Sequence, residues 1–186
     1  MENSIIYVIY FSIKGGLYVD IKIRTAVIED ASQIIEHTRG VIEESTFMLT
    51  APEEYNPTIE KEEEWIRDHL KDGNYLLVAE KSEKIIAVMN FHRSKRSRLS
   101  HLGYFSISIQ EAYCNMGIGR KLIEELLSWA EQQNDLEKVC LEVFSHNERA
   151  IHLYKKLGFI EEGRKVKFVK FTDDFYADEI LMYRFV

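Results

Sequence analysis

The stretch Tyr-Cys-Asn-Met-Gly-Ile-Gly-Arg-Lys at residues 113–121 leads directly into an apolar run with helical spacing. Gly117 and Gly119 lack side chains where this turn enters the helix, so a ligand can approach the backbone N–H groups closely. The first N–H groups of a helix have no intrahelical acceptor and lie at the positive end of its dipole. This join predicts a site for phosphate or pyrophosphate, although ordinary turns also use glycine pairs.

A second segment, residues 145–159, reads Ser-His-Asn-Glu-Arg-Ala-Ile-His-Leu-Tyr-Lys-Lys-Leu-Gly-Phe and predicts another helix. Ser145 and Glu148 have the spacing of a capping box, which places the start of the helix at Ser145. Asn147 and Tyr154 are seven residues apart, close to two helical turns, so both side chains project from one face. We expect the Asn147 amide to meet polar groups of a ligand and the Tyr154 phenol to donate a proton.

Together these segments resemble the motifs of the GNAT superfamily, the Gcn5-related N-acetyltransferases that use acetyl-CoA. The family pattern Gln/Arg-x-x-Gly-x-Gly/Ala corresponds to residues 114–119, and the pattern Asn-x-x-Ala-x-x-Leu-Tyr-x-x-x-Gly-Phe corresponds to residues 147–159. One position departs, because Cys114 stands where the family has Gln or Arg. The resemblance covers residues 21–186 in layout and is specific over residues 104–160.

The resemblance implies a set of acetyl-CoA contacts. The strand before the glycine turn binds the pantetheine arm through its backbone, the turn binds the pyrophosphate, and a cationic side chain adds charge pairing. Each strand position fits an ordinary sheet equally well, and the cation fits a solvated helix end. The implied residues are Ile107, Ser108, Ile109, Cys114, Asn115, Met116, Gly117, Ile118, Gly119, Arg120 and Asn147.

The resemblance also implies that Tyr154 is the general acid that protonates the leaving CoA thiolate. The alternative is a core tyrosine on an amphipathic helix. The acceptor amine must lose a proton before it attacks the thioester, and Glu142, on the strand before the second motif, is our candidate base. Glu43, Glu44 and Glu111 are further candidates, and no motif separates any of these carboxylates from an ordinary surface acid.

We expect no metal and no covalent enzyme intermediate. The six histidines lack metal-ligand spacing, and His146-Asn147-Glu148 matches the His-x-Glu of zinc deaminases without their Pro-Cys-x-x-Cys. Cys114 precedes a helix N-terminus, which lowers thiol pKa values, but no paired histidine is identifiable.

Composition fits a single domain of ordinary globular type. The chain has 186 residues, 46% of them hydrophobic, and a formal net charge of −7, which makes nucleic acid a poor partner. The apolar run at residues 5–11 is too short to span a bilayer, and we expect no membrane association. Two cysteines without metal spacing indicate a reducing compartment, so a cytoplasmic location is predicted. A homodimer is left open.

The order of apolar patterns predicts an α/β (α+β) fold. We expect a mixed, splayed central sheet flanked by helices on both faces, with a parallel pair formed by residues 102–109 and 139–144. Residues 20–186 form the predicted N-acetyltransferase domain, and residues 1–19 form an N-terminal extension, either an extra strand or a loosely attached segment. The other strands are predicted at residues 20–26, 75–80, 85–92, 159–171 and 175–185, and the helices at 29–42, 59–70, 122–130 and 145–157.

The predicted function is direct transfer of an acetyl group from acetyl-CoA to a primary amine of a small cationic molecule. Residues 43–57 and 172–178 form the acceptor side by resemblance, and the first of these segments is acidic. The alternatives are N-terminal acetylation of a protein, such as a ribosomal protein, and a CoA-binding regulatory domain without catalysis.

Overall fold

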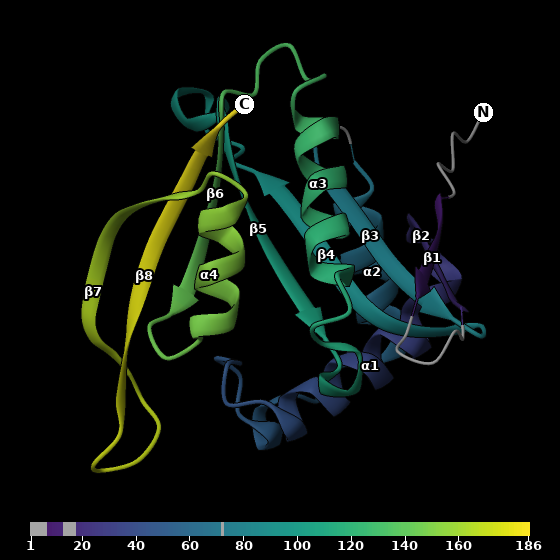
Figure 1. Cartoon of the computed structure of the whole chain (residues 1–186), viewed down its shortest axis with the longest axis horizontal. Coiled ribbons are helices and arrows are strands. Elements are labelled where there is room, and N and C mark those ends of the chain that lie inside the picture. The colour runs from purple at the N-terminus through teal and green to yellow at the C-terminus, as the bar shows by residue number, and fades with distance from the viewer. Residues whose placement is uncertain (1–6, 13–17, 72) are drawn as a thin grey trace. The chain divides into compact units, whose positions relative to one another are not determined.

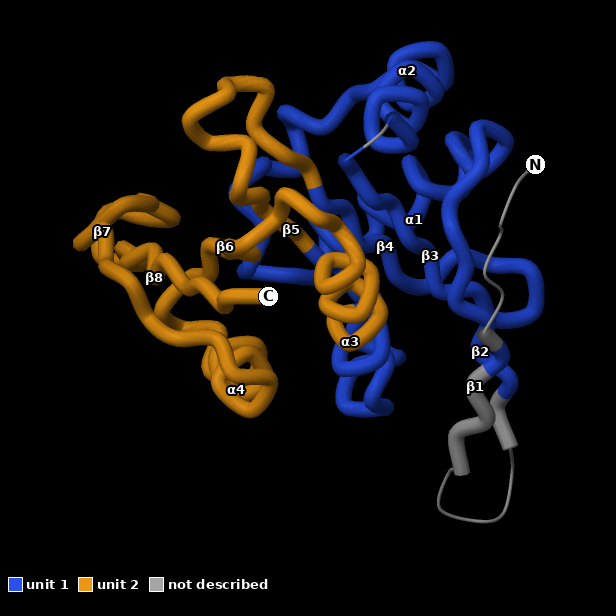
Figure 2. The backbone as a smooth tube through the Cα atoms, turned by 90° about the horizontal axis from the view of Figure 1, so that it is seen from above, with its two compact units in different colours: residues 1–91, 107–122 blue, residues 92–106, 123–186 orange. Residues whose placement is uncertain are grey.

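The computed structural model describes residues 7–12, 18–71 and 73–186. It divides into two compact units (Figure 2). Unit 1 comprises residues 1–91 and 107–122, and unit 2 comprises residues 92–106 and 123–186. None of the helices in the described ranges is both long and apolar enough to cross a membrane.

The helices and strands follow the predicted order (Figure 1). The helices are α1 (Ala31–Glu44), α2 (Ile59–His69), α3 (Ile118–Ala130) and α4 (Glu148–Lys156). The strands are β1 (Tyr7–Ser12), β2 (Tyr18–Thr25), β3 (Tyr75–Lys81), β4 (Lys84–Arg93), β5 (Leu102–Ile109), β6 (Lys138–Phe144), β7 (Ile160–Lys170) and β8 (Tyr176–Phe185). A short 3₁₀ turn, η4 (Glu111–Tyr113), lies between β5 and the glycine turn.

Unit 1 contains an antiparallel meander in which β1, β2, β3 and β4 pair in sequence. The β3–β4 turn consists of Ser82 and Glu83, whose φ angles of 48° and 64° are positive. Two consecutive residues with positive φ form the type I′ turn, whose twist matches that of a two-residue hairpin. The predicted hairpin is therefore confirmed, although neither turn residue is glycine.

Both faces of β3 and β4 are buried, because four consecutive residues of β3, Leu76–Ala79, are inaccessible. Helices α1 and α2 cover one face and lie behind these strands in Figure 1. Their contribution to the core includes Ile34 of α1 and Ile66 of α2, which pack with Leu76 and Val78. Successive strand residues point to opposite faces, so the continuous apolar run of β3 is that of a strand covered on both sides.

A buried ion-pair network joins β2 to the start of α1. Arg24 donates two hydrogen bonds to Asp30, at 2.7 and 2.8 Å, and one to Glu80, at 2.9 Å. Asp30 also accepts a hydrogen bond from the Val27 amide at 2.9 Å. The hydrogen bond to Asp30 raises the pKa of Arg24, so the guanidinium stays charged although it is largely covered.

Unit 2 contains the predicted parallel pair. Residues Leu102–Tyr104 of β5 pair in parallel with Lys138–Cys140 of β6. The pairing ends there, although β5 continues to Ile109 and β6 to Phe144. Strand β6 also pairs along its whole length with β8, which pairs in turn with β7, both antiparallel. The mixed sheet and the splay between its two parallel strands are confirmed.

Several of the predicted boundaries differ from the structure by a few residues, among them the starts of α4 and β2. Helix α4 begins at Glu148 with Asn147 as its N-cap, so the prediction of a capping box at Ser145 was wrong. The Ser145 amide donates a hydrogen bond to the Asp178 carbonyl, and the Ser145 hydroxyl accepts one from the Asp178 amide. These bonds lie just beyond the β6–β8 pairing and keep Ser145 out of the helix. Strand β2 begins at Tyr18, before the predicted start.

Within the predicted N-terminal extension, Tyr7–Ser12 forms β1, which pairs with Tyr18–Ile23 of β2. Residues 1–6 and 13–17 lie outside the described residues. The boundary between extension and domain stays a prediction.

Candidate active site

The end of β5 carries the residues predicted to bind the pantetheine arm. The Gln110 amide donates a hydrogen bond to the Ile86 carbonyl of β4 at 3.1 Å. Backbone polar groups alternate between the two edges of a strand, so those of Ser108 also face β4, whereas those of Ile107 and Ile109 face the opposite edge. The parallel pairing to β6 stops at Tyr104. An extended ligand can therefore add to this edge through backbone hydrogen bonds.

The glycine turn has the backbone geometry that the sequence predicts. Asn115 and Gly117 both have positive φ angles, 60° and 84°, which suit an Asn and a Gly. The Lys121 amide donates to the Gly117 carbonyl at 3.1 Å, which closes the first turn of α3. The amides of Ile118 and Gly119 then belong to the first turn of α3, where backbone N–H groups point beyond the helix end. This turn fits a pyrophosphate group.

The Cys114 thiol folds back toward the end of β5. Its Sγ atom lies 3.9 Å from the Ile109 carbonyl and 3.7 Å from the Gln110 carbonyl, both weak thiol hydrogen bonds. These contacts favour Cys114 as a support of the turn.

Asn147 lies at the N-cap of α4, and its Oδ1 atom accepts a hydrogen bond from the Ala150 amide at 3.2 Å. The side-chain oxygen of Asn147 therefore caps the N-terminus of α4, a role for which Asn is a favoured residue. Its amide nitrogen is the atom with two hydrogens to donate. A ligand contact through this side chain would use those hydrogens.

Tyr154 lies on α4 and is 7% exposed. Its ring packs edge-on against Phe105 of β5 at 5.9 Å and against Phe159 at 6.0 Å. Burial raises the pKa of the Tyr154 hydroxyl, because desolvation disfavours the phenolate. The phenol is therefore protonated at neutral pH, the state that a general acid requires.

Glu142 on β6 is part of a carboxylate–lysine cluster. The Lys165 ammonium of β7 lies 3.0 Å from Glu142 and 2.6 Å from Glu179 of β8. Glu179 is buried, whereas the side chain of Glu142 is 43% exposed. Hydrogen bonds to both carboxylates raise the pKa of Lys165, that to Glu179 most strongly. The Lys165 ammonium therefore joins the two carboxylates into one ion-paired cluster.

Two side chains of α1 contact the segment between β5 and the glycine turn. His37 Nε2 lies 2.9 Å from Ser108 Oγ, and Glu44 Oε1 accepts a hydrogen bond from the Glu111 amide at 2.7 Å. The sequence analysis considered Glu44 as a base and did not single out His37. The signal was present, because His37 interrupts the apolar stripe of α1 between Ile34 and Val41.

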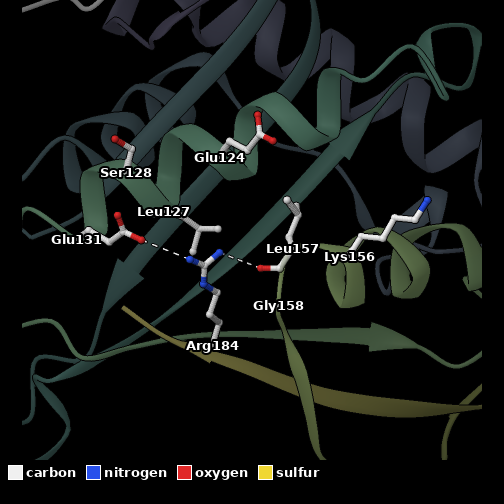
Figure 3. A pocket seen from close by; sticks show the side chains of 8 residues that line it. All are labelled: Glu124, Leu127, Ser128, Glu131, Lys156, Leu157, Gly158 and Arg184. Atoms are coloured by element: carbon white, nitrogen blue, oxygen red, sulfur yellow. Dashed lines mark hydrogen bonds and ion pairs between the residues drawn. The ribbon is translucent and has the colours of Figure 1, made fainter.

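A shallow pocket in unit 2 lies apart from the predicted site residues (Figure 3). Arg184 of β8 crosses it, donating to the Leu157 carbonyl at 2.9 Å and to Glu131 at 3.4 Å. The Leu157 carbonyl belongs to the C-terminal end of α4, which lacks intrahelical donors. Arg184 therefore stabilises the end of this helix. The pocket is lined by Glu124, Leu127, Ser128, Glu131, Lys156, Leu157, Gly158 and Arg184.

The predicted site residues divide between the two units. Unit 1 holds the β5 end and the whole glycine turn, residues 107–120, so the segments predicted to bind pantetheine and pyrophosphate follow one another along the chain there. Unit 2 holds Glu142, Asn147 and Tyr154.

Comparisons with known proteins agree with this geometry. The model of the acetyltransferase (GNAT) family matches residues 41–159. An N-alpha-acetyltransferase of Sulfolobus acidocaldarius is 30% identical over 169 residues, covering 86% of this chain and 88% of the relative. A spermidine N(1)-acetyltransferase of Vibrio cholerae is 30% identical over 139 residues, covering 70% and 75%.

A crystal structure of an acetyltransferase of the GNAT family from Streptococcus pneumoniae superposes with a TM-score of 0.85. It is 29% identical in sequence, and the match covers 89% of this chain and 99% of that one. The family model spans both motifs, the glycine turn at residues 114–119 and the helix at residues 147–159. The chain therefore belongs to the acetyltransferase (GNAT) family and is an acetyl-CoA-dependent N-acetyltransferase.

Proposed function

We propose that this N-acetyltransferase transfers the acetyl group directly to a primary amine of a small cationic molecule. The observation that carries the acceptor class is a half-buried carboxylate, Glu62, on α2. Burial raises the pKa of Glu62, and it takes part in no ion pair among the described residues. A partly desolvated carboxylate without a cation is stabilised by a ligand that supplies one.

The surroundings of Glu62 support a cationic ligand. Burial raises the pKa of Tyr55, in the loop before α2, and the Glu62 carboxylate raises it further, whereas a hydrogen bond to Thr38 of α1 and the charge of Arg39 lower it. Exposed carboxylates at Glu43 and Glu53 add negative charge along the same α1–α2 segment. A polyamine or another small amine with a second positive charge would be attracted to this surface. The spermidine acetyltransferase among the relatives acts on such a molecule.

On the donor side, acetyl-CoA supplies a thioester whose acetyl group is open to attack by an amine. We assign backbone groups of Ile107 and Ile109 to the pantetheine arm, and the first-turn amides of α3 to the pyrophosphate. The Asn147 amide nitrogen donates to the pantetheine arm. Residues 20–186 form the catalytic domain in this proposal, and residues 1–19 form an extension of it.

Tyr154 acts as the general acid. The amine nitrogen forms a bond to the acetyl carbonyl carbon, the carbon–sulfur bond breaks, and the Tyr154 hydroxyl gives its proton to the leaving sulfur. The tyrosine then recovers a proton from water. The amine loses its own proton to a base, for which Glu142 stays our candidate, acting directly or through water. Buried packing against Phe105 and Phe159 fixes the phenol for this transfer.

The substitution Tyr154→Phe tests this role, because it removes the hydroxyl and keeps the ring packing. We expect turnover to fall about tenfold or more while the affinity for CoA changes little. Asn147→Ala is the matched contrast and should weaken CoA binding. If Tyr154→Phe turns over at the wild-type rate under conditions where chemistry limits the rate, Tyr154 is not the general acid and serves only in packing.

The second candidate acceptor is the N-terminal amine of a protein, favoured by the N-alpha-acetyltransferase relative. A CoA-release assay separates the two classes when it is run with spermidine, single amino acids and short peptides that have free N-termini. Release with spermidine, weakened by Glu62→Gln, supports the cationic acceptor. Release with peptides alone overturns it, and CoA binding without release for any amine indicates a domain that binds but does not catalyse.

A further inference from the structure

Helix α1 makes two side-chain contacts with one short segment of unit 1. The segment is residues 108–111, where β5 ends and the path to the glycine turn begins. His37 reaches Ser108 at 2.9 Å, and Glu44 reaches the Glu111 amide at 2.7 Å. Both contacts join residues far apart in the sequence, separated by 71 and 67 positions.

The spacing of the two contacts matches on both sides. His37 and Glu44 are seven residues apart on a helix, which corresponds to about 10.5 Å along its axis and nearly two full turns. Ser108 and Glu111 are three residues apart, and the chain between them is extended up to the start of η4 at Glu111, which corresponds to about 10 Å. Helix and segment therefore run side by side in the same direction, and both contacts form without distorting either element. Val41, one turn from His37 on the same face, is buried.

The contact at His37 is fixed more firmly than a surface hydrogen bond. The His37 side chain is 1% exposed, and its Nδ1 atom is buried without a hydrogen-bond partner among the described residues. Ser108 is thus the polar partner on which this buried ring depends. From the other side, the Gln110 amide is bonded to the Ile86 carbonyl of β4. The segment is consequently held at three successive points, Ser108, Gln110 and Glu111.

We propose that His37 and Glu44 are positioning residues for acetyl-CoA. They hold residues 108–111 so that the free edge of β5 and the amides of the glycine turn keep one geometry before the co-substrate arrives. Neither side chain touches the reacting atoms. Their effect is on affinity, because a backbone already ordered loses less conformational freedom when a ligand binds. This inference rests on the proposed donor site.

The experiment measures the dissociation constant of CoA by titration calorimetry for the wild-type chain and four variants. Glu44→Ala and Ser108→Ala each remove one contact, Glu44→Gln keeps an oxygen acceptor, and Glu36→Ala alters an exposed residue on the same helix. We expect CoA binding to weaken about fivefold or more in the two contact variants. Glu36→Ala should bind as the wild type does, and Glu44→Gln should bind more tightly than Glu44→Ala because it keeps an oxygen acceptor for the Glu111 amide.

Two further readouts separate positioning from general stability. Glu44→Ala should speed hydrogen exchange at the Glu111 amide, and the KM for acetyl-CoA should rise while kcat at saturating acetyl-CoA is kept. Because Glu44 is exposed, we expect Glu44→Ala to stay folded. Ser108→Ala removes the hydrogen-bond partner of the buried His37 ring, and the test does not depend on that variant being folded.

Unchanged CoA affinity in a folded Glu44→Ala, with the wild type binding CoA, would overturn the positioning role alone. A wild-type chain that binds no CoA would overturn the proposed donor site and this inference with it. Weaker CoA binding in Glu36→Ala as well would mean that α1 acts through overall stability, and that result too contradicts the proposal.

Discussion

His37 should make the stability of the protein fall in mild acid. Burial lowers the pKa of His37 from 6.5 to about 4, because the imidazolium would lose its hydration and gain no carboxylate. Above pH 6.5 the ring is neutral in the folded and unfolded chains, so it gives no pH dependence. Between pH 6.5 and about 4 the unfolded chain binds the proton and the folded chain does not, so stability decreases as pH falls.

The magnitude follows from the same two pKa values. Each unit of pKa difference corresponds to about 1.4 kcal/mol, so the full interval amounts to roughly 3 kcal/mol by pH 4. A typical domain has a free energy of unfolding of about 5–15 kcal/mol, so this single ring accounts for a considerable part of it. The carboxylates titrate over part of the same range, and the contribution of His37 must be isolated by difference.

Urea unfolding at several pH values between about 7.5 and 4.5 measures the effect, with wild type, His37→Gln and His152→Gln compared. His152 is an exposed histidine of α4 and serves as the control. His37→Gln should lose stability at neutral pH and show a shallower decline in acid, by up to about 1.4 kcal/mol per pH unit. Parallel pH profiles for wild type and His37→Gln would refute the assignment of a buried, neutral ring.

Two pairs of substitutions test the ion pairs. Asp30→Ala leaves Arg24 with Glu80 as its remaining carboxylate and should lower the free energy of unfolding by about 3 kcal/mol. Asp68→Ala, at an exposed pair with Lys71, should change it by less than about 1 kcal/mol. Equal losses for the two variants in urea unfolding would contradict the inference that burial makes the Arg24–Asp30 pair the more important one. Glu142→Gln should lower turnover about tenfold or more if Glu142 is the base, while Lys165→Met, which breaks the ion pair but keeps the carboxylate, should retain activity. A Glu142→Gln enzyme with normal turnover would remove Glu142 from the mechanism.

The sequence alone was sufficient for the order of elements and for the donor motif. Apolar periodicity and turn preferences depend on residues only a few positions apart, so they can be recognised in the sequence alone. The positive φ angle of Gly117 agrees with the predicted turn for that reason, although α3 begins at Ile118, before the predicted start at residue 122. The parallel pair of β5 and β6 follows from the same local patterns, because a helix between two strands returns the chain in the same direction.

The tertiary structure decided the features that depend on distant partners. Ser145 has the local spacing of a helix cap, but pairing with Asp178 keeps it extended, so the cap falls at Asn147 instead. In the sequence Glu44 looks like an ordinary surface carboxylate, yet it accepts a hydrogen bond from the Glu111 amide 67 positions away. No short-range pattern encodes which carboxylate meets which amide, since that is fixed only when packing brings α1 against the end of β5. The sequence was therefore sufficient to identify the donor motif, whereas the contacts that hold the motif in place depend on the tertiary structure.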